Sequence, residues 1–221
     1  MWTLKLGDKM QPPVLVAELS GNHNHSLSVA KELIHSSAEA GADAIKLQTF
    51  KPETITMISE KPRYQIDKKK WGVATLAELY EEVAMPWDWQ AELRDLAKKL
   101  GLGFFSTPFD KTAVNFLMDI GVDAMKVASP EIVDTPLVEY VVQQNLPTIL
   151  STGGATRSDV ALVFEKLTDE QREKLCILHC IAEYPVSSSD ANLATLNHLS
   201  SEFSVKVGLS DHSIGTQTAY A

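Results

Sequence analysis

The feature that most constrains this 221-residue sequence is a repeated pattern in which a short apolar run ends in a small group of polar residues. The pattern covers 14–24, 44–50, 102–110, 124–131, 148–154, 176–185 and 205–213. Amphipathic helical patterns lie between most of these runs, and regular alternation of strands with helices is typical of parallel β/α architecture. We therefore predict an α/β fold with parallel strands.

The spacing of the runs favours a (β/α)8 TIM barrel. A complete barrel of this kind has eight β/α units in typically about 250 residues, whereas seven strands are predicted here. Seven strands in barrel order would leave two unpaired edges, which proteins avoid. We therefore predict a single domain over 1–221, a TIM barrel truncated after about seven β/α units, with the eighth unit outside this sequence.

Apolar periodicity and capping residues set the expected elements. Strands are predicted at 14–19, 44–49, 102–106, 124–128, 147–151, 175–180 and 205–209. Helices are predicted at about 27–40, 75–85, 86–101, 111–120, 135–145, 158–167, 168–174 and 191–202. Asp110 is the predicted N-cap of the helix at 111–120. The segment 51–74, rich in Lys and Pro, is predicted to be a long connection, either a lid over a site or a mobile surface loop.

Composition and charge exclude several classes of protein. The formal net charge of −9 argues against nucleic acid or an anionic membrane as a partner. Neither the first 13 residues nor any later run has the apolar length of a signal peptide or a membrane span. Cysteines that are core thiols favour a reducing cytoplasm, which is the predicted location. Cys176 and Cys180 lie four residues apart on one predicted strand, which at about 3.3 Å per residue is too far for a disulfide.

Two lysines stand inside predicted apolar strands, close to the carboxyl ends where α/β proteins bind their ligands. These are Lys46 and Lys126. Because a buried lysine is rarely unpaired, each needs an anionic partner. That partner is either an internal carboxylate, for which Glu18 and Glu131 are candidates, or a bound anion.

Hydroxyl groups follow four of the predicted strands, at Thr107, Ser129, Ser151 and Ser210. Each one alone is typical of a cap or a turn, but four at equivalent positions would converge on one point. The segment 151–154, Ser-Thr-Gly-Gly, also offers backbone N–H groups to a phosphate. The strand ends thus predict a site for a small anion.

The six histidines include one, His212, that follows the last predicted strand and would face the same site. Since metal sites usually have two or more protein ligands, a metal bound by His212 would need a second ligand beyond Ala221. The other histidines are predicted to lie in the core, on helix surfaces or, for His23 and His25, in local hydrogen bonds.

The sequence resembles the sialic acid synthase family across nearly its whole length. The resemblance rests on seven motifs in the family's order: AELSGNHN at 17–24, KLQT at 46–49, STPF at 106–109, KVAS at 126–129, STG at 151–153, YP at 184–185 and GLSDH at 208–212. The set is specific, although no single member is. The segments 71–72, 75–76, 79–80 and 86–89 are most similar to the pseudaminic acid synthase branch.

This resemblance implies condensation of phosphoenolpyruvate with an open-chain N-acetylated amino hexose, which gives a nonulosonic acid and phosphate. Pseudaminic acid synthase is the primary hypothesis, and N-acetylneuraminate or legionaminate synthase is the alternative. A barrel without catalytic activity, retained for binding or assembly, is the alternative from another class of protein.

The resemblance also implies roles for individual residues. Lys46 and Gln48 would hold the carboxylate end of phosphoenolpyruvate, and its phosphate would be surrounded by Thr107, Lys126, Ser129, Ser151 and Ser210. Glu18 would handle protons or stabilise the cationic C2, while Glu131 and Tyr184 would face the sugar. His212 would be one of two histidine ligands of a divalent ion, Mn²⁺ in the family with Mg²⁺ or Co²⁺ as alternatives, which polarises the sugar aldehyde.

Three departures from the family pattern qualify these expectations. The second metal-binding histidine, on the eighth strand, would lie outside this sequence. So would the C-terminal antifreeze-like domain, which lends an arginine to the partner subunit of a homodimer. These two departures predict that residues 1–221 alone are inactive. Ile181 and Ala182 replace a polar pair of the family, which removes hydrogen-bonding groups near the predicted phosphate site.

Overall fold

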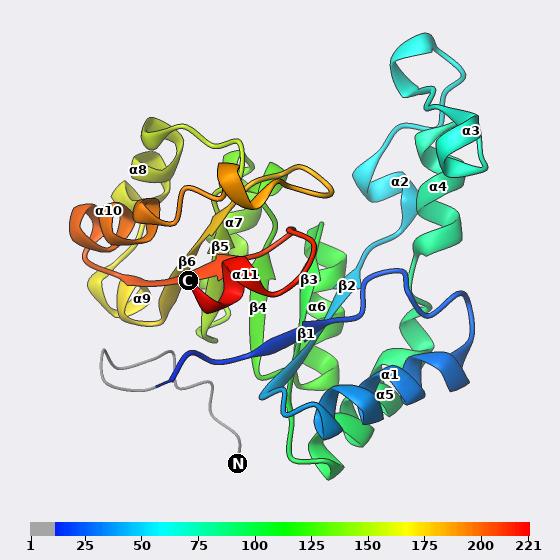
Figure 1. Cartoon of the computed structure of the whole chain (residues 1–221), viewed down its shortest axis with the longest axis horizontal. Helices are drawn as coiled ribbons and strands as arrows, with labels where there is room; N and C mark the ends of the chain where they lie inside the picture. The colour runs from blue at the N-terminus through cyan, green and yellow to red at the C-terminus, as the bar shows by residue number, and fades with distance from the viewer. Residues whose placement is uncertain (1–11) are drawn as a thin grey trace. The chain divides into compact units, whose positions relative to one another are not determined.

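The computed structural model describes residues 12–221, which form two compact units, unit 1 (14–123) and unit 2 (12–13 and 124–221). Each unit consists of consecutive β/α repeats whose neighbouring strands are parallel and follow the chain order (Figure 1). The predicted α/β class with parallel strands is therefore confirmed. The expectation about a signal peptide falls largely on residues 1–11, outside the described residues.

Unit 1 contains three parallel strands with helices packed beside them. The strands are β1 (Val16–Glu18), β2 (Ala44–Thr49) and β3 (Gly103–Pro108), and the longer helices are α1 (Leu27–Glu39), α5 (Trp87–Lys99) and α6 (Lys111–Ile120). Helix α1 packs against α5, while α5 and α6 contact β3. The core between them is apolar and includes the fully buried Ile45, Leu93 and Phe104.

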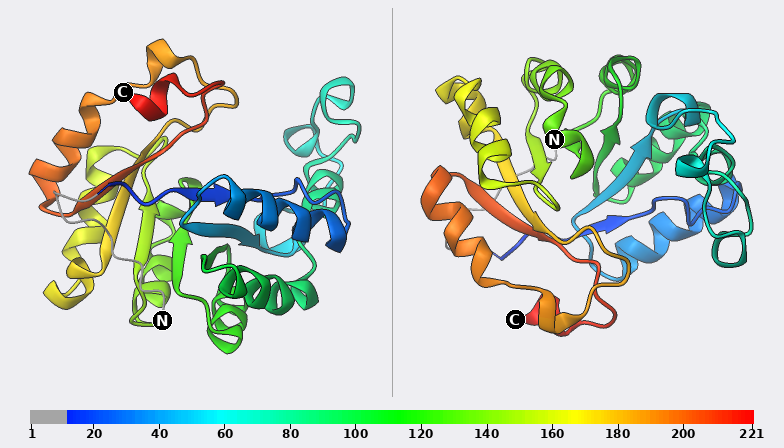
Figure 2. Two further views of the ribbon diagram at one scale, coloured as in Figure 1. Left: turned by 60° about the horizontal axis from the view of Figure 1, so that its bottom comes forward. Right: turned by 90° about the horizontal axis from the view of Figure 1, so that it is seen from above.

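The segment between β2 and α5 contains the predicted helix at about 75–85 and also short helices that were not predicted. It forms α2 (Pro52–Ile55), the 3₁₀ turn η1 (Pro62–Tyr64), α3 (Lys68–Trp71) and α4 (Leu76–Val83), with an antiparallel bridge between Gln65 and Thr75. Figures 1 and 2 show α3 and its neighbouring turns, coloured cyan to teal, extending away from the strands of unit 1. The predicted long connection at 51–74 is thus locally folded.

Unit 2 contains four parallel strands, β4 (Ala124–Val127), β5 (Thr148–Ser151), β6 (Leu175–Cys180) and β7 (Lys206–Ser210). Its helical elements are η2 (Pro130–Val133), α7 (Thr135–Val142), α8 (Arg157–Glu165), α9 (Asp169–Glu173), η3 (Ser188–Asp190), α10 (Ala194–Phe203) and α11 (Gln217–Tyr220). Helix α10 contacts β6 and β7, and the fully buried Met125, Leu150 and Ile177 contribute to the core.

Most predicted elements match the observed ones within a few residues, and the differences have local causes. Strand β1 is shorter than the predicted 14–19, and helix α10 starts at Ala194 instead of 191. The later start follows from Asn192, whose positive φ of 46° is incompatible with a helix. Helix α11 was not predicted. No helix within residues 12–221 is long and apolar enough to cross a membrane.

The two cysteines are buried and unbridged, as predicted. Burial raises the pKa of the Cys176 thiol to about 12, although the charge of Lys206 opposes the shift. A thiol that stays protonated is a poor nucleophile and metal ligand, so Cys176 is a core residue.

Candidate active site

The residues predicted to form the site lie within strands or just beyond their carboxyl ends, in both units. Unit 1 carries Glu18, Lys46, Gln48 and Thr107, and unit 2 carries Lys126, Ser129, Glu131, Ser151, Tyr184, Ser210 and His212. This is the end of a parallel β/α sheet at which ligands bind.

In unit 1 the strand register places the four predicted residues on one face. Glu18 pairs with Lys46 across β1 and β2, and Gln48 pairs with Thr107 across β2 and β3. Since alternate residues of a strand share a face, and Gln48 is two residues beyond Lys46, all four side chains face the same side.

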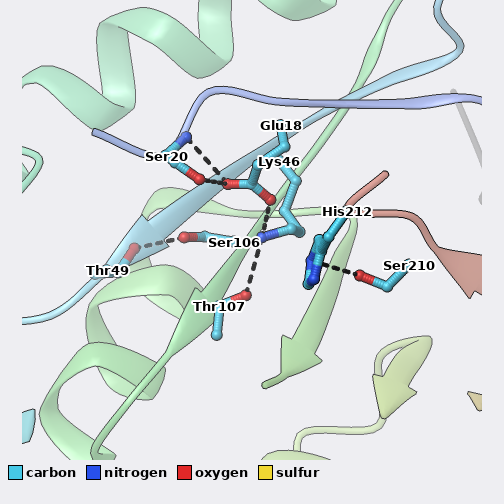
Figure 3. Close-up of polar contacts among 8 residues, drawn as sticks. All are labelled: Glu18, Ser20, Lys46, Thr49, Ser106, Thr107, Ser210 and His212. Carbon is cyan, nitrogen blue, oxygen red and sulfur yellow. Dashed lines mark hydrogen bonds and ion pairs between the residues drawn. The ribbon is translucent and has the colours of Figure 1, made fainter. Parts of the chain in front are cut away.

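The buried Lys46 forms an ion pair with Oε2 of Glu18, and its Nζ also donates to Oγ1 of Thr107 at 3.4 Å (Figure 3). The other oxygen of Glu18 accepts from the backbone N–H of Ser20 at 3.0 Å and from its hydroxyl at 2.9 Å. Of the two partners proposed for Lys46, the internal carboxylate is the observed one. Ser20, which sequence reasoning did not single out, orients that carboxylate.

A second polar group supports β2 and β3 from within unit 1. The Thr49 hydroxyl donates to Oε1 of Gln90 at 2.8 Å and lies 2.7 Å from the Ser106 hydroxyl, and all three residues are buried. These contacts satisfy buried polar atoms next to Gln48 and Thr107, so they hold the strand ends in place.

In unit 2 the register likewise gathers polar groups on one face. Lys126 pairs with Ile149, two residues before Ser151, and Cys180 pairs with Ser210. Ser151 pairs with Leu178, two residues before Cys180. Lys126, Ser151 and Ser210 therefore face the same side of β4 to β7.

Two buried oxygen atoms of unit 2 have no hydrogen-bond partner within the described residues. They are Oγ of Ser151 and Oε2 of Glu131. An unsatisfied buried polar group costs about 1–3 kcal/mol, so each is a candidate contact for a ligand. Burial raises the pKa of Glu131, and a backbone hydrogen bond and the positive charge of Lys126 oppose that shift only in part.

The loop after β5 approaches the loop after β4 closely at Gly153. Its backbone N–H donates to the Ser129 hydroxyl at 3.0 Å. A Cβ at position 153 would lie 2.9 Å from Oγ of Ser129 and 3.1 Å from both the carbonyl oxygen and Sγ of Cys180. Glycine is therefore favoured at this close approach. The hydrogen bond from its N–H to Ser129 helps to fix the conformation of the Ser-Thr-Gly-Gly loop.

His212 lies just beyond β7, with both ring nitrogens near other groups. Its Nδ1 is 2.8 Å from the carbonyl oxygen of Ile181. Figure 3 shows the other contact, in which Nε2 lies 3.5 Å from the Ser210 hydroxyl. The Tyr184 ring stacks on the imidazole with 4.1 Å between ring centroids. Among residues 12–221, no group of three or more His, Cys, Asp or Glu side chains is arranged to hold a metal ion.

The remaining histidines lie largely as predicted. His179 is buried and contacts the carbonyl of Ala191, and His198 is on a helix surface beside Glu202. His23 accepts a local hydrogen bond from the N–H of His25 at 3.1 Å. Its burial, and then the proximity of His25, lower the pKa of the His23 ring, so the neutral form is favoured in the fold.

The fold defines the chain as a parallel α/β protein of the (β/α)8-barrel class, with polar side chains near the strand ends of each unit. Residues 33–221 match the model of the NeuB family, and the chain belongs to this family. The resemblance noted from the sequence motifs is thereby confirmed.

Several relatives support this assignment. The chain is 41% identical to the pseudaminic acid synthase of Helicobacter pylori over 94% of its own length and 61% of the relative. It is 39% identical to the pseudaminic acid synthase of Campylobacter jejuni over 91% of its own length and 59% of the relative. It is 35% identical to the N,N'-diacetyllegionaminic acid synthase of Legionella pneumophila over 91% of its own length and 58% of the relative. The chain thus spans about three fifths of the length of these relatives.

Solved structures agree with the fold. The N-acetylneuraminic acid synthetase of Leptospira borgpetersenii matches with a TM-score of 0.82 and 29% identity, over 94% of this chain and 67% of that one. A 3-deoxy-D-arabino-heptulosonate 7-phosphate synthase of Thermotoga maritima matches with a TM-score of 0.63 at 13% identity, over 90% and 64%, and shows the fold alone.

Proposed function

We propose that this chain is the barrel part of a synthase that condenses phosphoenolpyruvate with an open-chain N-acetylated amino hexose, giving a nonulosonic acid and phosphate. Family membership and the similarity to synthases of three related acids support this reaction class. Pseudaminic acid is the proposed product, because the identity to pseudaminic acid synthases, 38–41%, exceeds the 32–35% identity to legionaminic acid synthases.

The observation that carries the proposal is the unsatisfied hydroxyl of Ser151. It is buried, it lies at the carboxyl end of β5, and its register places it on the same face as Lys126. A hydroxyl donor and an ammonium group on one face suit the oxygens of a phosphate. In the following loop, a side chain at position 153 would crowd Ser129 and Cys180.

In unit 1 the proposed role of Lys46 and Gln48 is to hold the carboxylate end of phosphoenolpyruvate. Lys46 already contacts Glu18 and Thr107, so a substrate carboxylate would add a further acceptor to an ammonium group that has three donors. Ser20 donates twice to Glu18, which keeps that carboxylate in place beside Lys46 during the reaction.

The proposed chemistry needs one new carbon–carbon bond and one departing phosphate. C3 of phosphoenolpyruvate bonds to the aldehyde carbon, and the aldehyde oxygen takes up a proton. Water then adds to the cationic C2, and the tetrahedral carbon collapses to a ketone as phosphate leaves. Glu18 is the proposed group that stabilises the cationic carbon or exchanges protons. Glu131 is the proposed sugar contact, and its raised pKa suits donation of a hydrogen bond.

His212 is the proposed protein ligand of a divalent ion, with Mn²⁺ as the first candidate. The fit is favourable, because the carbonyl of Ile181 can only accept a hydrogen bond, so Nδ1 carries the proton and Nε2 keeps its lone pair. Such an ion, when bound, supplies Lewis acidity to the sugar aldehyde. A cytoplasmic homodimer is likewise part of the proposal.

The inactive-barrel alternative is based on Ile181 and Ala182, whose side chains lack the hydrogen-bonding groups that the family has near the phosphate. In the structure the backbone carbonyl of Ile181 makes the contact to His212, and any residue at this position retains that group. The substitution therefore leaves the contact with His212 in place, and the loss of hydrogen-bonding side chains near the phosphate stays a prediction.

The test is an assay of phosphate release by the protein from the complete gene, supplied with phosphoenolpyruvate, Mn²⁺ and one candidate hexose at a time. Hexoses of the pseudaminic, legionaminic and neuraminic series are compared. Release with the pseudaminic precursor is expected. Release only with N-acetylmannosamine contradicts the proposed product, and no release with any hexose favours the inactive barrel.

A further inference from the structure

The segment 181–186 of unit 2 encloses His212 on several sides. Nδ1 of the ring is 2.8 Å from the Ile181 carbonyl oxygen, and the Tyr184 ring stacks on the imidazole at 4.1 Å with 27° between the planes. The backbone N–H of Val186 donates to the carbonyl of His212 at 3.1 Å, in a short parallel bridge with Ser213. One segment therefore contacts the backbone, one edge and one face of the same histidine.

The edge contact selects a tautomer. A backbone carbonyl accepts hydrogen bonds and never donates them, so Nδ1 of His212 must carry the proton. The neutral ring then presents the lone pair of Nε2, which lies 3.5 Å from the Ser210 hydroxyl, the limit of a hydrogen bond. A ring arranged in this way is ready to bind a cation through Nε2.

The face contact restricts rotation of the ring. A single hydrogen bond at Nδ1 leaves the imidazole free to rock about it, whereas a stacked aromatic ring excludes tilted orientations. Tyr184 is 69% exposed, so its ring contributes little to the core of unit 2. Its ring stacks on His212 instead.

We propose that Tyr184 is a positioning residue for His212. Its ring, together with the Ile181 carbonyl, holds the imidazole in the Nδ1–H tautomer with Nε2 free for a divalent cation. The inference rests on the proposed function in one respect, that His212 binds such a cation. It differs from the sugar-facing role predicted for Tyr184, because positioning requires the ring whereas a sugar contact requires the hydroxyl.

The experiment compares the complete protein with three variants. Tyr184→Leu removes the ring, and Tyr184→Phe keeps the ring and removes the hydroxyl. Tyr220→Leu is the matched control, because Tyr220 lies in the same unit and is 88% exposed. Mn²⁺ affinity is measured by titration of metal-free protein without substrates, with free Mn²⁺ followed by electron paramagnetic resonance. Tyr184→Leu is expected to weaken binding by roughly tenfold, the usual effect of losing a group that orients a ligand, and the other two variants are expected to bind as wild type does.

A second measurement does not depend on metal. The ¹⁵N chemical shifts of the His212 ring in metal-free protein report which nitrogen carries the proton. The Nδ1–H form is expected to dominate in wild type and in Tyr184→Phe, and to lose its dominance in Tyr184→Leu.

The outcomes separate the inference from the proposed function. If wild type binds no Mn²⁺, the metal part of the proposed function fails, and the ring shifts still decide whether Tyr184 positions His212. If Tyr184→Leu keeps both the Mn²⁺ affinity and the ring shifts of wild type, the inference is overturned while the proposed function stands. Equal weakening by Tyr184→Phe and Tyr184→Leu also overturns it, because the hydroxyl would then carry the effect.

Discussion

At the scale of single residues, backbone groups hold several side chains of the candidate site in place. Lysines inside apolar strands are unusual, which is why Lys46 and Lys126 stand out. Three backbone groups orient side chains of the candidate site. The N–H of Gly153 contacts Ser129, the N–H of Ser20 contacts Glu18, and the carbonyl of Ile181 contacts His212. Every residue except proline carries both of these backbone groups, so the sequence gives no signal that distinguishes them.

The first prediction concerns Lys126. Replacement by Met removes a buried positive charge from the face that carries Ser151, and phosphoenolpyruvate affinity is expected to fall about a hundredfold or more. Isothermal titration calorimetry with the complete protein measures the loss, and circular dichroism checks that the fold is retained. An unchanged affinity would assign Lys126 to an internal pair with Glu131, whose charge it influences.

The second prediction concerns Gly153. In Gly153→Ala the new Cβ would lie 2.9 Å from the Ser129 hydroxyl oxygen and 3.1 Å from the carbonyl oxygen and Sγ of Cys180, so these groups would have to shift. A loss of about 1–3 kcal/mol in the free energy of unfolding is expected, with weaker phosphoenolpyruvate binding. Urea denaturation and calorimetry give the two values. If the free energy of unfolding and the phosphoenolpyruvate affinity both equal those of wild type, the loop has room to move.

At the scale of elements, the predictions succeed where local signals and burial agree. Helix α6 runs from Lys111 to Ile120 as predicted, because Asp110 caps its start and Gly121, at φ 75°, ends it. Strand β2 also has its predicted bounds, since nearly all its residues are buried. Helices α2 and α3, four residues each, were missed because so short a helix shows no apolar periodicity.

The third prediction concerns the cap of α6. Oδ1 of Asp110 accepts from the backbone N–H groups of Thr112 at 2.6 Å and Ala113 at 3.1 Å. Asp110→Ala is expected to lower the free energy of unfolding by about 1 kcal/mol, whereas Asp110→Asn, which retains a capping oxygen, is expected to lose much less. Urea denaturation at neutral pH compares the variants, and equal losses would contradict the capping role.

The same carboxylate predicts a dependence on pH. Burial alone would raise the pKa of Asp110, but hydrogen bonds from the side chain of Thr112 and from two backbone N–H groups outweigh it and lower the pKa. Because the folded pKa is below the unfolded one, this stabilisation is fully present above the unfolded pKa and is lost as pH falls through the folded value. Asp110→Asn is expected to flatten that part of the stability profile.

At the scale of the whole molecule, the net charge of the chain and the charge of the proposed substrate have the same sign. The chain carries a formal net charge of −9, and the proposed substrate phosphoenolpyruvate is an anion. Long-range forces from such a chain oppose the approach of the substrate, whereas the attraction of Lys46 and Lys126 acts at short range from buried positions. The net charge is evident from composition, but the local attraction depends on strand register.

The contrast between long-range repulsion and short-range attraction gives the fourth prediction. Salt screens interactions between charges more than about 10 Å apart at 0.1 M ionic strength and affects buried contacts much less. The association rate constant of phosphoenolpyruvate is therefore expected to stay constant or rise as ionic strength increases from low to physiological values. Stopped-flow measurement of tryptophan fluorescence gives this rate constant, and Lys111→Gln, which removes an exposed charge, serves as the control for a general charge effect. A steep fall with salt would show that positive surface charge steers the substrate, and the site would then be attractive at long range despite the acidic chain.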